Sequence, residues 1–198
     1  MKFASCNLCG ADDPRELYPS TLNQNGRILG GSAFLCTSPD YGEHYRIVQC
    51  NRCGFVYANP HADPNEVLRA YEDVVDPLYL QERVGREHTF REHLGTLHRI
   101  SGEPNGRRLL DVGAYVGVFV EIARELGWNA EGIEPSSWAV AHARERGLPV
   151  TQGTLASGGF PDESFEVITL WDVIEHFDDP MTELNHVFRL LKPGGVVV

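Results

Sequence analysis

Two short cysteine motifs of identical spacing stand in the first third of this chain. Cys6 and Cys9 enclose two residues and precede a glycine, and Cys50 and Cys53 repeat the pattern. A C-x-x-C turn directs two thiolates at one ion, and the glycine relieves the tight backbone behind it. The two pairs together supply the tetrahedral sulfur ligands that Zn²⁺ prefers, and a closed shell leaves no position for substrate. We therefore predict a structural zinc site at these four cysteines.

Other uses of cysteine and histidine stay open beside this ligand set. The four thiols can lie buried without a metal, and Cys36 or His44 can replace one of the four ligands. His88, His93 and His98 recur every five residues. That spacing does not line one face of a helix, so it disfavours a metal site there.

A second chemical cluster follows the short apolar run that begins at Arg107. Gly113 and Gly117 interrupt the run, and apolar residues then resume at helical spacing. The pattern indicates strand, tight turn and helix, which brings backbone N–H groups and the positive end of a helix to the carboxyl edge of a sheet. Glu134 ends the next predicted strand about twenty residues later, where an acid can accept both ribose hydroxyls of an adenosine.

The spacing of these glycines distinguishes two kinds of adenosine ligand. A dinucleotide fingerprint has glycines at relative positions 1, 3 and 6. Here Gly113 and Gly117 are four residues apart, and Asp111 stands two residues before the first. Without the glycine that lets a pyrophosphate approach, the pattern favours an adenosine ligand that lacks one.

The elements that must position this cluster alternate regularly between strand and helix. Strands alternating with helices predict a parallel sheet with right-handed crossovers, which is an α/β doubly wound fold. We expect strands near 108–112, 129–133, 149–152, 165–170 and from 195, and helices at 117–126, 136–146 and 179–191.

The residues before this fold form two accessory segments. Residues 1–58 predict a small β-rich zinc ribbon with strands at 46–49 and 55–57. Residues 59–104 predict a helical linker, with one helix at 64–73 and a second from about 78 to 100 whose mixed charges indicate a solvated face. The doubly wound domain is expected at 105–198.

Composition limits the partners of the chain. With 198 residues, 42% of them hydrophobic, it can bury a core, and its net charge of −11 gives no reason to bind nucleic acid. No apolar run has the length of a membrane span, and the first residues do not resemble a signal peptide, so we expect a cytoplasmic protein. The last residues, up to Val198, have the apolar pattern of the start of a buried strand. We therefore expect a longer polypeptide and a sheet truncated after its fifth strand.

Residues 107–198 resemble the class I S-adenosylmethionine-dependent methyltransferases, whose fold is Rossmann-like. Tyr115 departs from the family pattern, which usually has glycine there. The N-terminal segment, residues 1–58, is similar to the zinc-binding segment that precedes this domain in some bacterial members, which often act on sugars, lipids or secondary metabolites. The motifs that carry the resemblance are Leu110-Asp111-Val112-Gly113-Ala114-Tyr115-Val116-Gly117, the acid Glu134, the run from Phe165 to His176, and Leu191-Lys192-Pro193-Gly194-Gly195.

The resemblance implies S-adenosylmethionine as cofactor and a role for each matching residue. The loop after the first strand would surround the methionine part, Glu134 would hold the ribose, and the fourth strand would end near the sulfonium. An acid usual in the family near Thr154 is missing. The implied cofactor residues are Asp111, Gly113, Ala114, Tyr115, Gly117, Glu134, Pro135, Ser136, Thr154, Leu155, Trp171 and Asp172.

Catalytic roles centre on Glu175 and His176. His176 is the candidate general base, because imidazole titrates near neutral pH. Alternatively, the Glu-His pair orders its loop, or Asp172, Glu175 and His176 hold Mg²⁺ or another divalent ion against a substrate oxygen. The leading hypothesis is methyl transfer to a small-molecule acceptor. Its rivals are a catalytically silent scaffold for protein contacts and a nicotinamide-dependent oxidoreductase.

Overall fold

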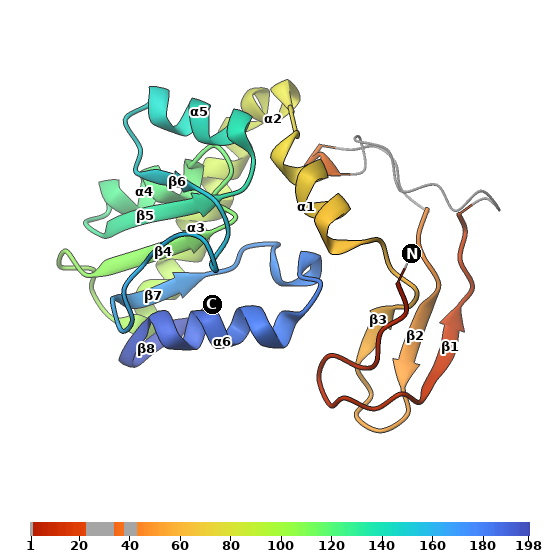
Figure 1. Ribbon diagram of the computed structural model, residues 1–198. Coiled ribbons are helices and arrows are strands. Elements are labelled where there is room, and N and C mark those ends of the chain that lie inside the picture. Colours follow the sequence, from red (N-terminus) through yellow and green to blue (C-terminus); the bar gives the residue numbers. More distant parts are fainter. Residues whose placement is uncertain (1, 23–33, 38–42) are drawn as a thin grey trace.

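A computed structural model describes residues 2–22, 34–37 and 43–198 of the chain. Figure 1 shows a small antiparallel sheet on one side and a larger parallel sheet on the other, with helices between them. The small sheet contains β1 (Pro14–Tyr18), β2 (Ile47–Cys50) and β3 (Val56–Ala58), in the order β1-β2-β3. The sequence predicts β2 and β3 but not β1, because four of the five residues of β1 are exposed and carry no alternating pattern.

The large sheet confirms the predicted α/β class. Its five strands run parallel in the order β6-β5-β4-β7-β8. The last strand begins at Leu191 rather than near 195, because the backbone of Leu191 is extended directly after the preceding helix and pairs with Phe165. The strands are β4 (Arg108–Val112), β5 (Asn129–Glu134), β6 (Val150–Gln152), β7 (Phe165–Thr169) and β8 (Leu191–Val197).

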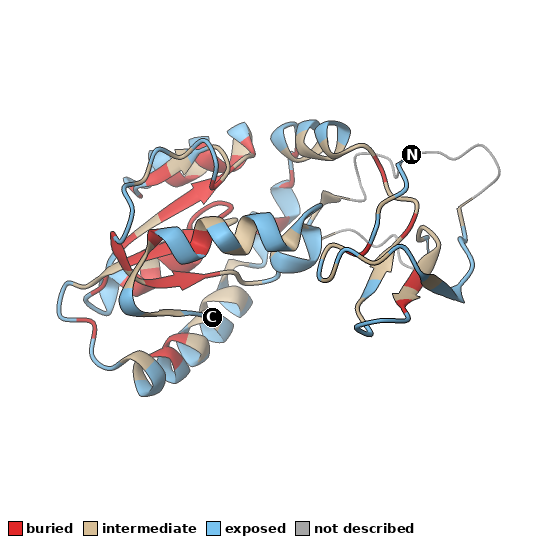
Figure 2. Ribbon diagram, turned by 60° about the horizontal axis from the view of Figure 1, so that its bottom comes forward, coloured by how far each residue is buried: buried red, intermediate tan, exposed pale blue. Residues whose placement is uncertain are grey.

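Helices cover both faces of this sheet, and the strand residues between them are buried (Figure 2). Alternate residues of β4 divide between two cores: Leu109 joins the one formed with α3, α4 and α5, and Leu110 joins the one formed with α6. The doubly wound arrangement follows from this alternation. The helices are α3 (Arg83–Ser101), α4 (Val118–Glu125), α5 (Ser137–Glu145) and α6 (Pro180–Leu190).

The linker contains three helices where the sequence predicts two. The first, α1 (Pro64–Glu72), begins as expected, with the Asp63 side chain accepting a hydrogen bond from the backbone N–H of Asn65 at 2.8 Å. The second predicted helix is divided into α2 (Pro77–Gln81) and α3, which meet at Glu82. In the part of the chain with described coordinates, no helix is both long and apolar enough to span a bilayer.

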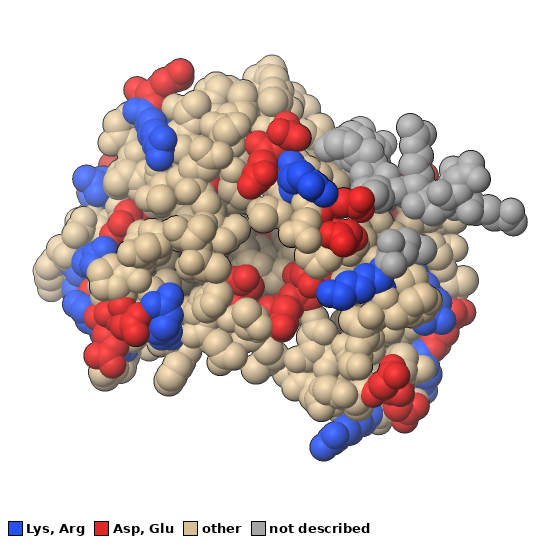
Figure 3. All heavy atoms as spheres, viewed as in Figure 1, with Lys and Arg blue, Asp and Glu red and all other residues tan. Residues whose placement is uncertain are grey.

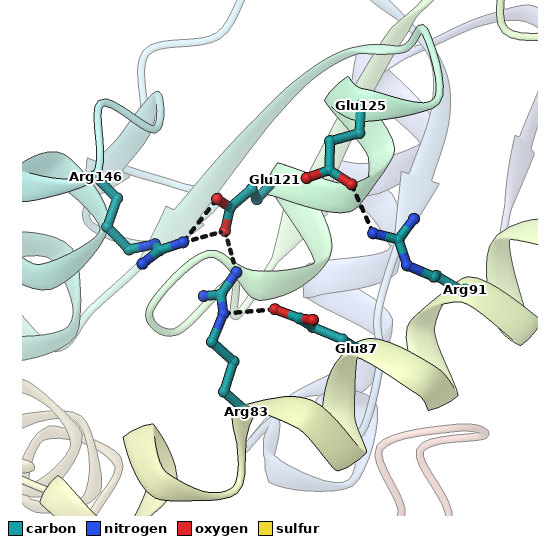
Figure 4. Close-up of polar contacts among 6 residues, drawn as sticks. All are labelled: Arg83, Glu87, Arg91, Glu121, Glu125 and Arg146. Carbon is teal, nitrogen blue, oxygen red and sulfur yellow. Dashed lines mark hydrogen bonds and ion pairs between the residues drawn. The ribbon is translucent and has the colours of Figure 1, made fainter.

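The charges of α3 do not form the purely solvated face that the sequence predicts. Leu94 and Leu97 of α3 are buried in the main core. Figure 4 shows Arg83 of α3 and Arg146, which follows α5, both paired with Glu121 of α4, and Arg91 paired with Glu125. These charges therefore fix α3 against the domain.

We expect Glu121→Gln to lower the free energy of unfolding by about 1–2 kcal/mol, because the partly buried Glu121 carboxylate pairs with two guanidinium groups, and in the variant Arg83 keeps only Glu87 while Arg146 loses its partner. Burial by itself would raise the pKa of Glu121, but hydrogen bonds and charge from Arg146 and Arg83 lower it below its usual value. Urea unfolding near pH 7 measures the effect. The matched control is Glu125→Gln, where both partners are about half exposed and the expected loss is below about 0.5 kcal/mol. Equal losses of unfolding free energy in the two variants would contradict the expected difference between them.

Candidate functional site

The four paired cysteines meet at one point beside the small sheet. Their sulfur atoms all lie within 4.8 Å of one another, with 3.5 Å from Cys6 to Cys53 and 3.6 Å from Cys9 to Cys50. Ligands at the Zn–S distance of a tetrahedral site lie roughly 3.8 Å apart, so the cluster fits this ion. Cys36 and His44 are not part of it.

Two equivalent turns hold these sulfurs. The backbone N–H of Gly10 donates to the Cys6 carbonyl at 2.8 Å, and that of Gly54 donates to the Cys50 carbonyl at 2.9 Å. Both glycines have positive φ, 72° and 80°, which a residue with a side chain rarely adopts. Hydrogen bonds from the backbone of Cys53 and Arg52 lower the pKa of Cys50, which favours the thiolate that a metal requires.

A cavity of about 1230 Å³ lies between the small sheet and the carboxyl edge of the large one. Figure 3 shows this hollow with acidic side chains around it. Of the residues that the resemblance assigns to the cofactor, all but Gly117 line the cavity. Gly117 does not line the cavity. A Cβ at this position would lie 2.7 Å from Leu148, so glycine here allows the loop to pack closely against that side chain.

Two buried acids stand at the cavity end of adjacent strands. Asp111 accepts a hydrogen bond from the Thr169 hydroxyl at 2.7 Å. The two oxygens of Glu134 accept from the backbone N–H groups of Tyr115 at 3.0 Å and Ser136 at 2.8 Å. Burial raises the pKa of each carboxyl to about 7, against the opposing effect of these donors. Glu134 is thus fixed by the very loop that carries the glycines.

The loop itself has a backbone that few residues tolerate. Gly113 has φ 69°, and a Cβ there would lie 2.6 Å from Val173. Tyr115 also has positive φ, 49°, so it takes up a glycine-like conformation at the position where it departs from the family pattern. Its ring packs edge-on against Tyr79, with centroids 4.4 Å apart, and is buried.

The end of β7 brings further predicted residues to the cavity. Trp171 stacks on His93 with ring centroids 4.6 Å apart, and Asp172 follows with φ 52°. His176 lies in a 3₁₀ turn, Ile174–His176, and its Nδ1 is 2.8 Å from the hydroxyl of Tyr71.

The structure does not support the divalent metal site at Asp172, Glu175 and His176. Within the described ranges, the four cysteines are the one group of at least three potential ligands whose atoms converge within 4.8 Å. His176 Nδ1 lies 2.8 Å from the hydroxyl of Tyr71.

A family model described as a methyltransferase domain matches residues 86–198, more than half of the chain. The chain belongs to the S-adenosylmethionine-dependent methyltransferases. This confirms the resemblance seen in the motifs, and it disfavours the nicotinamide alternative.

Individual relatives agree with the family. The chain is 27% identical over 136 residues to a probable S-adenosylmethionine-dependent methyltransferase of Mycolicibacterium smegmatis, covering 68% of this chain and 53% of the relative. It is 34% identical over 99 residues to a ubiquinone biosynthesis O-methyltransferase of Methylococcus capsulatus, covering 46% and 42%. The chain therefore spans about half the length of these curated relatives.

A solved structure supports the fold of the methyltransferase domain. The crystal structure of a SAM-dependent methyltransferase from Archaeoglobus fulgidus aligns with a TM-score of 0.51 at 19% identity, covering 62% of this chain and 57% of that one. At this identity, the likeness shows a shared fold.

Sequence reasoning missed the linker residues that complete the cavity of this methyltransferase. Tyr71, Tyr79 and Arg86 line it, and Arg86 is the one arginine or lysine among the lining residues that the structure describes. Their helices carry no motif, and their contribution depends on how the linker folds back over the sheet. The position of Pro77 after Asp76, a cap for the short helix α2, is the one local signal for that turn.

We expect the ligand-free methyltransferase to lose stability as the pH rises from 5 to 8. Asp111 and Glu134 have folded-state pKa values raised to about 7, so between their ordinary values and 7 the folded state binds more protons than the unfolded state. The expected loss is roughly 2–4 kcal/mol in urea unfolding. Asp111→Asn should flatten the profile, because the amide still accepts from Thr169 but does not titrate. An equally steep profile in that variant would contradict the assignment.

Proposed function

We propose that the chain carries the cofactor site and part of the acceptor site of a methyltransferase that acts on a small molecule: a sugar, a lipid or a secondary metabolite. The observation that carries the proposal is one cavity whose lining includes the two buried acids, His176 and residues beside the paired cysteines. Its volume exceeds the roughly 300–1,000 Å³ typical of one small ligand, so it has room for cofactor and acceptor together.

The cofactor half lies over the carboxyl ends of β4 and β5. This is where an open α/β sheet binds ligands. Glu134 would accept the ribose hydroxyls with the lone pairs left by its two backbone donors, and Asp111 would shape the loop around the methionine part. Pro135, Thr154 and Leu155 would border the adenine. The sulfonium would lie near Trp171 and Asp172.

The acceptor half is walled by the zinc ribbon. Asn7 and Leu8 lie between the first two cysteines, and Phe55 and Tyr57 follow the second pair; all four line the cavity. The predicted zinc site would thus hold part of the acceptor wall in place without touching the reaction. The segment from the 3₁₀ turn at Ile174–His176 to the first turn of α6 adds four acids to the wall, which favours a neutral or cationic acceptor over an anionic one: Glu175, Asp178, Asp179 and Glu183.

Bound S-adenosylmethionine supplies a methyl group on a good leaving group, so the main task of the protein is alignment. His176 would take the proton of the acceptor nucleophile if it carries one. In the proposed tautomer the Nδ1–H of His176 donates to the Tyr71 oxygen, and Nε2 carries the lone pair that accepts the proton. Burial raises the pKa of Tyr71 above its usual value, so its hydroxyl stays neutral beside the imidazole.

The test is transfer of a labelled methyl group from S-adenosylmethionine to pooled sugars, lipids and secondary metabolites by the zinc-loaded protein, with S-adenosylhomocysteine calorimetry in parallel. We expect one bound S-adenosylhomocysteine per chain and label in one acceptor class. Absence of heat would favour the silent scaffold, and fluorescence enhancement of NADH would revive the oxidoreductase.

We expect His176→Ala to lower turnover about 100-fold, because it removes the proposed base, while the Kd for S-adenosylhomocysteine changes less than twofold. Tyr71→Phe should have a smaller effect of about fivefold, since it removes the orienting partner of the imidazole. Steady-state kinetics and calorimetry measure both. His142→Ala is the control, because His142 bonds the Trp138 carbonyl on α5 and does not line the cavity. Unchanged turnover in His176→Ala would reject the base assignment.

A further inference from the structure

The loop that carries His176 has little structure of its own. It connects β7 to α6 and forms one 3₁₀ turn, Ile174–His176, none of whose residues is buried. The backbone N–H of His176 donates to the Val173 carbonyl at 2.9 Å, and that of Phe177 donates to the Ile174 carbonyl at 3.3 Å. An exposed segment with few internal hydrogen bonds opens easily unless other elements hold it. Contacts from outside the loop therefore decide where the imidazole lies.

Two donors from the N-terminal side of the cavity meet at Asp178, two residues after His176. The side-chain amide of Asn7 donates to the backbone carbonyl of Asp178, and Nδ1 of His61 lies 2.9 Å from the Asp178 carboxylate. The same Nδ1 lies 2.9 Å from the carbonyl oxygen of Ala62, and two acceptors beside one nitrogen assign the proton to it. Figure 1 shows the segment between β7 and α6 on the side that faces the small sheet. Asp178 is thus held by both its backbone and its side chain.

Asn7 and His61 belong to one frame. The backbone N–H of Lys2 donates to the His61 carbonyl at 2.9 Å, and that of His61 donates to the Lys2 carbonyl at 3.0 Å. The buried side chain of Asn59 accepts from the N–H of Ala4 at 3.2 Å and donates to its carbonyl at 3.0 Å. These bonds tie the segment that enters the first cysteine turn to the segment that leaves the ribbon. The two donors therefore act on Asp178 from one rigid support.

We infer that the zinc ribbon positions the proposed base: Asn7 and His61 hold Asp178, and Asp178 holds the turn that carries His176. This inference rests on the proposed function for the role of His176. Asn7 lies between two of the predicted zinc ligands, so ligation of these cysteines fixes the turn from which it donates. Asn7 and His61 are positioning residues, and a displacement of about 1 Å at a reacting group can cost up to about 100-fold in rate.

The test joins hydrogen-exchange mass spectrometry of the zinc-loaded chain with transfer of labelled methyl groups from S-adenosylmethionine to the pooled acceptors. We expect Asn7→Ala to speed exchange of the amides at 174–178 about fivefold and to lower kcat about tenfold, because it removes one of the bonds that hold the loop. The KM for S-adenosylmethionine, the Kd for S-adenosylhomocysteine and the zinc content should stay within twofold.

The ion pair is tested separately by a double-mutant cycle. His61→Phe keeps a ring but removes the donor, and Asp178→Ala removes its acceptor. Each should lower kcat about threefold, and the double variant should lose no more than either single one, because all three remove the same contact. Additive losses would show that the two side chains act independently and would contradict this part of the inference.

Asn51→Ala is the matched control for Asn7→Ala. Asn51 has the same position in the second cysteine turn, donates to Asp13 at 3.1 Å within the ribbon and does not line the cavity. It should change neither exchange at 174–178 nor kcat. In Asn7→Ala the inference requires both changes, so either one without the other overturns it, and so does loss of zinc together with kcat. A wild type that neither transfers methyl groups nor binds S-adenosylhomocysteine would overturn the proposed function itself, and exchange at 174–178 would then still decide whether the ribbon holds this loop.

Discussion

Glu134→Gln is expected to weaken binding of S-adenosylhomocysteine about 10²- to 10³-fold. The carboxylate would accept two ribose hydroxyls, and each hydrogen bond to a charged group contributes about 1.5–3 kcal/mol. Its oxygens already accept from the N–H groups of Tyr115 and Ser136. The amide oxygen of glutamine can accept from one of these N–H groups, but its N–H₂ would face the other N–H, donor against donor. The loop therefore also loses one of the hydrogen bonds that hold it. Calorimetry measures the affinity.

The matched control is Glu131→Gln in the same strand. Glu131 pairs with Arg108 at 2.6 Å and does not line the cavity, so the affinity should change less than twofold. Thermal melting of both variants separates loss of binding from loss of folding. An affinity of Glu134→Gln within threefold of the wild type would show that the ribose lies elsewhere.

Removal of zinc, or Cys50→Ser, is expected to unfold the small sheet. Three short strands bury little apolar surface, and structural zinc in small modules contributes on the order of 10 kcal/mol of folding free energy. Because residues of the ribbon line the proposed acceptor half of the cavity, acceptor binding should fall with it, while S-adenosylhomocysteine binding changes less than about tenfold. Metal analysis, circular dichroism and calorimetry before and after chelation measure the three effects.

Cys36→Ser is the control for this prediction, since Cys36 is exposed and outside the cluster. It should keep one zinc per chain, and Cys50→Ser should not. Full secondary structure in the chelated protein, with zinc absent, would show that the four thiols pack without a metal, the alternative that the sequence left open.

The fold and the zinc cluster were largely predictable because they depend on local patterns. Apolar periodicity located the five parallel strands to within a few residues, and the repeated C-x-x-C-G motif identified all four sulfurs that converge. The two buried acids were predictable for the same reason: each stands at the carboxyl end of a strand, and the doubly wound topology makes those ends adjacent.

What the sequence did not predict depends on contacts between distant segments. The hydrogen bond of Tyr71 to His176 spans 105 positions, and the stack of Arg86, Tyr79 and Tyr115 joins α3, α2 and the loop after β4. No local pattern encodes such pairs. The alternatives at Asp172, Glu175 and His176 depend on the same kind of information, and these three side chains are not among the groups of converging metal ligands in the described part of the chain. The domain limits at 58 and 104 and the individual site roles remain predictions.

The most direct test of the central claim is a crystal structure of the zinc-loaded protein with S-adenosylhomocysteine. We expect the ribose hydroxyls within hydrogen-bond distance of both Glu134 oxygens, with the amino acid part over Gly113. Density for the ligand at another edge of the sheet, or Glu134 turned away from an empty cavity, would contradict it.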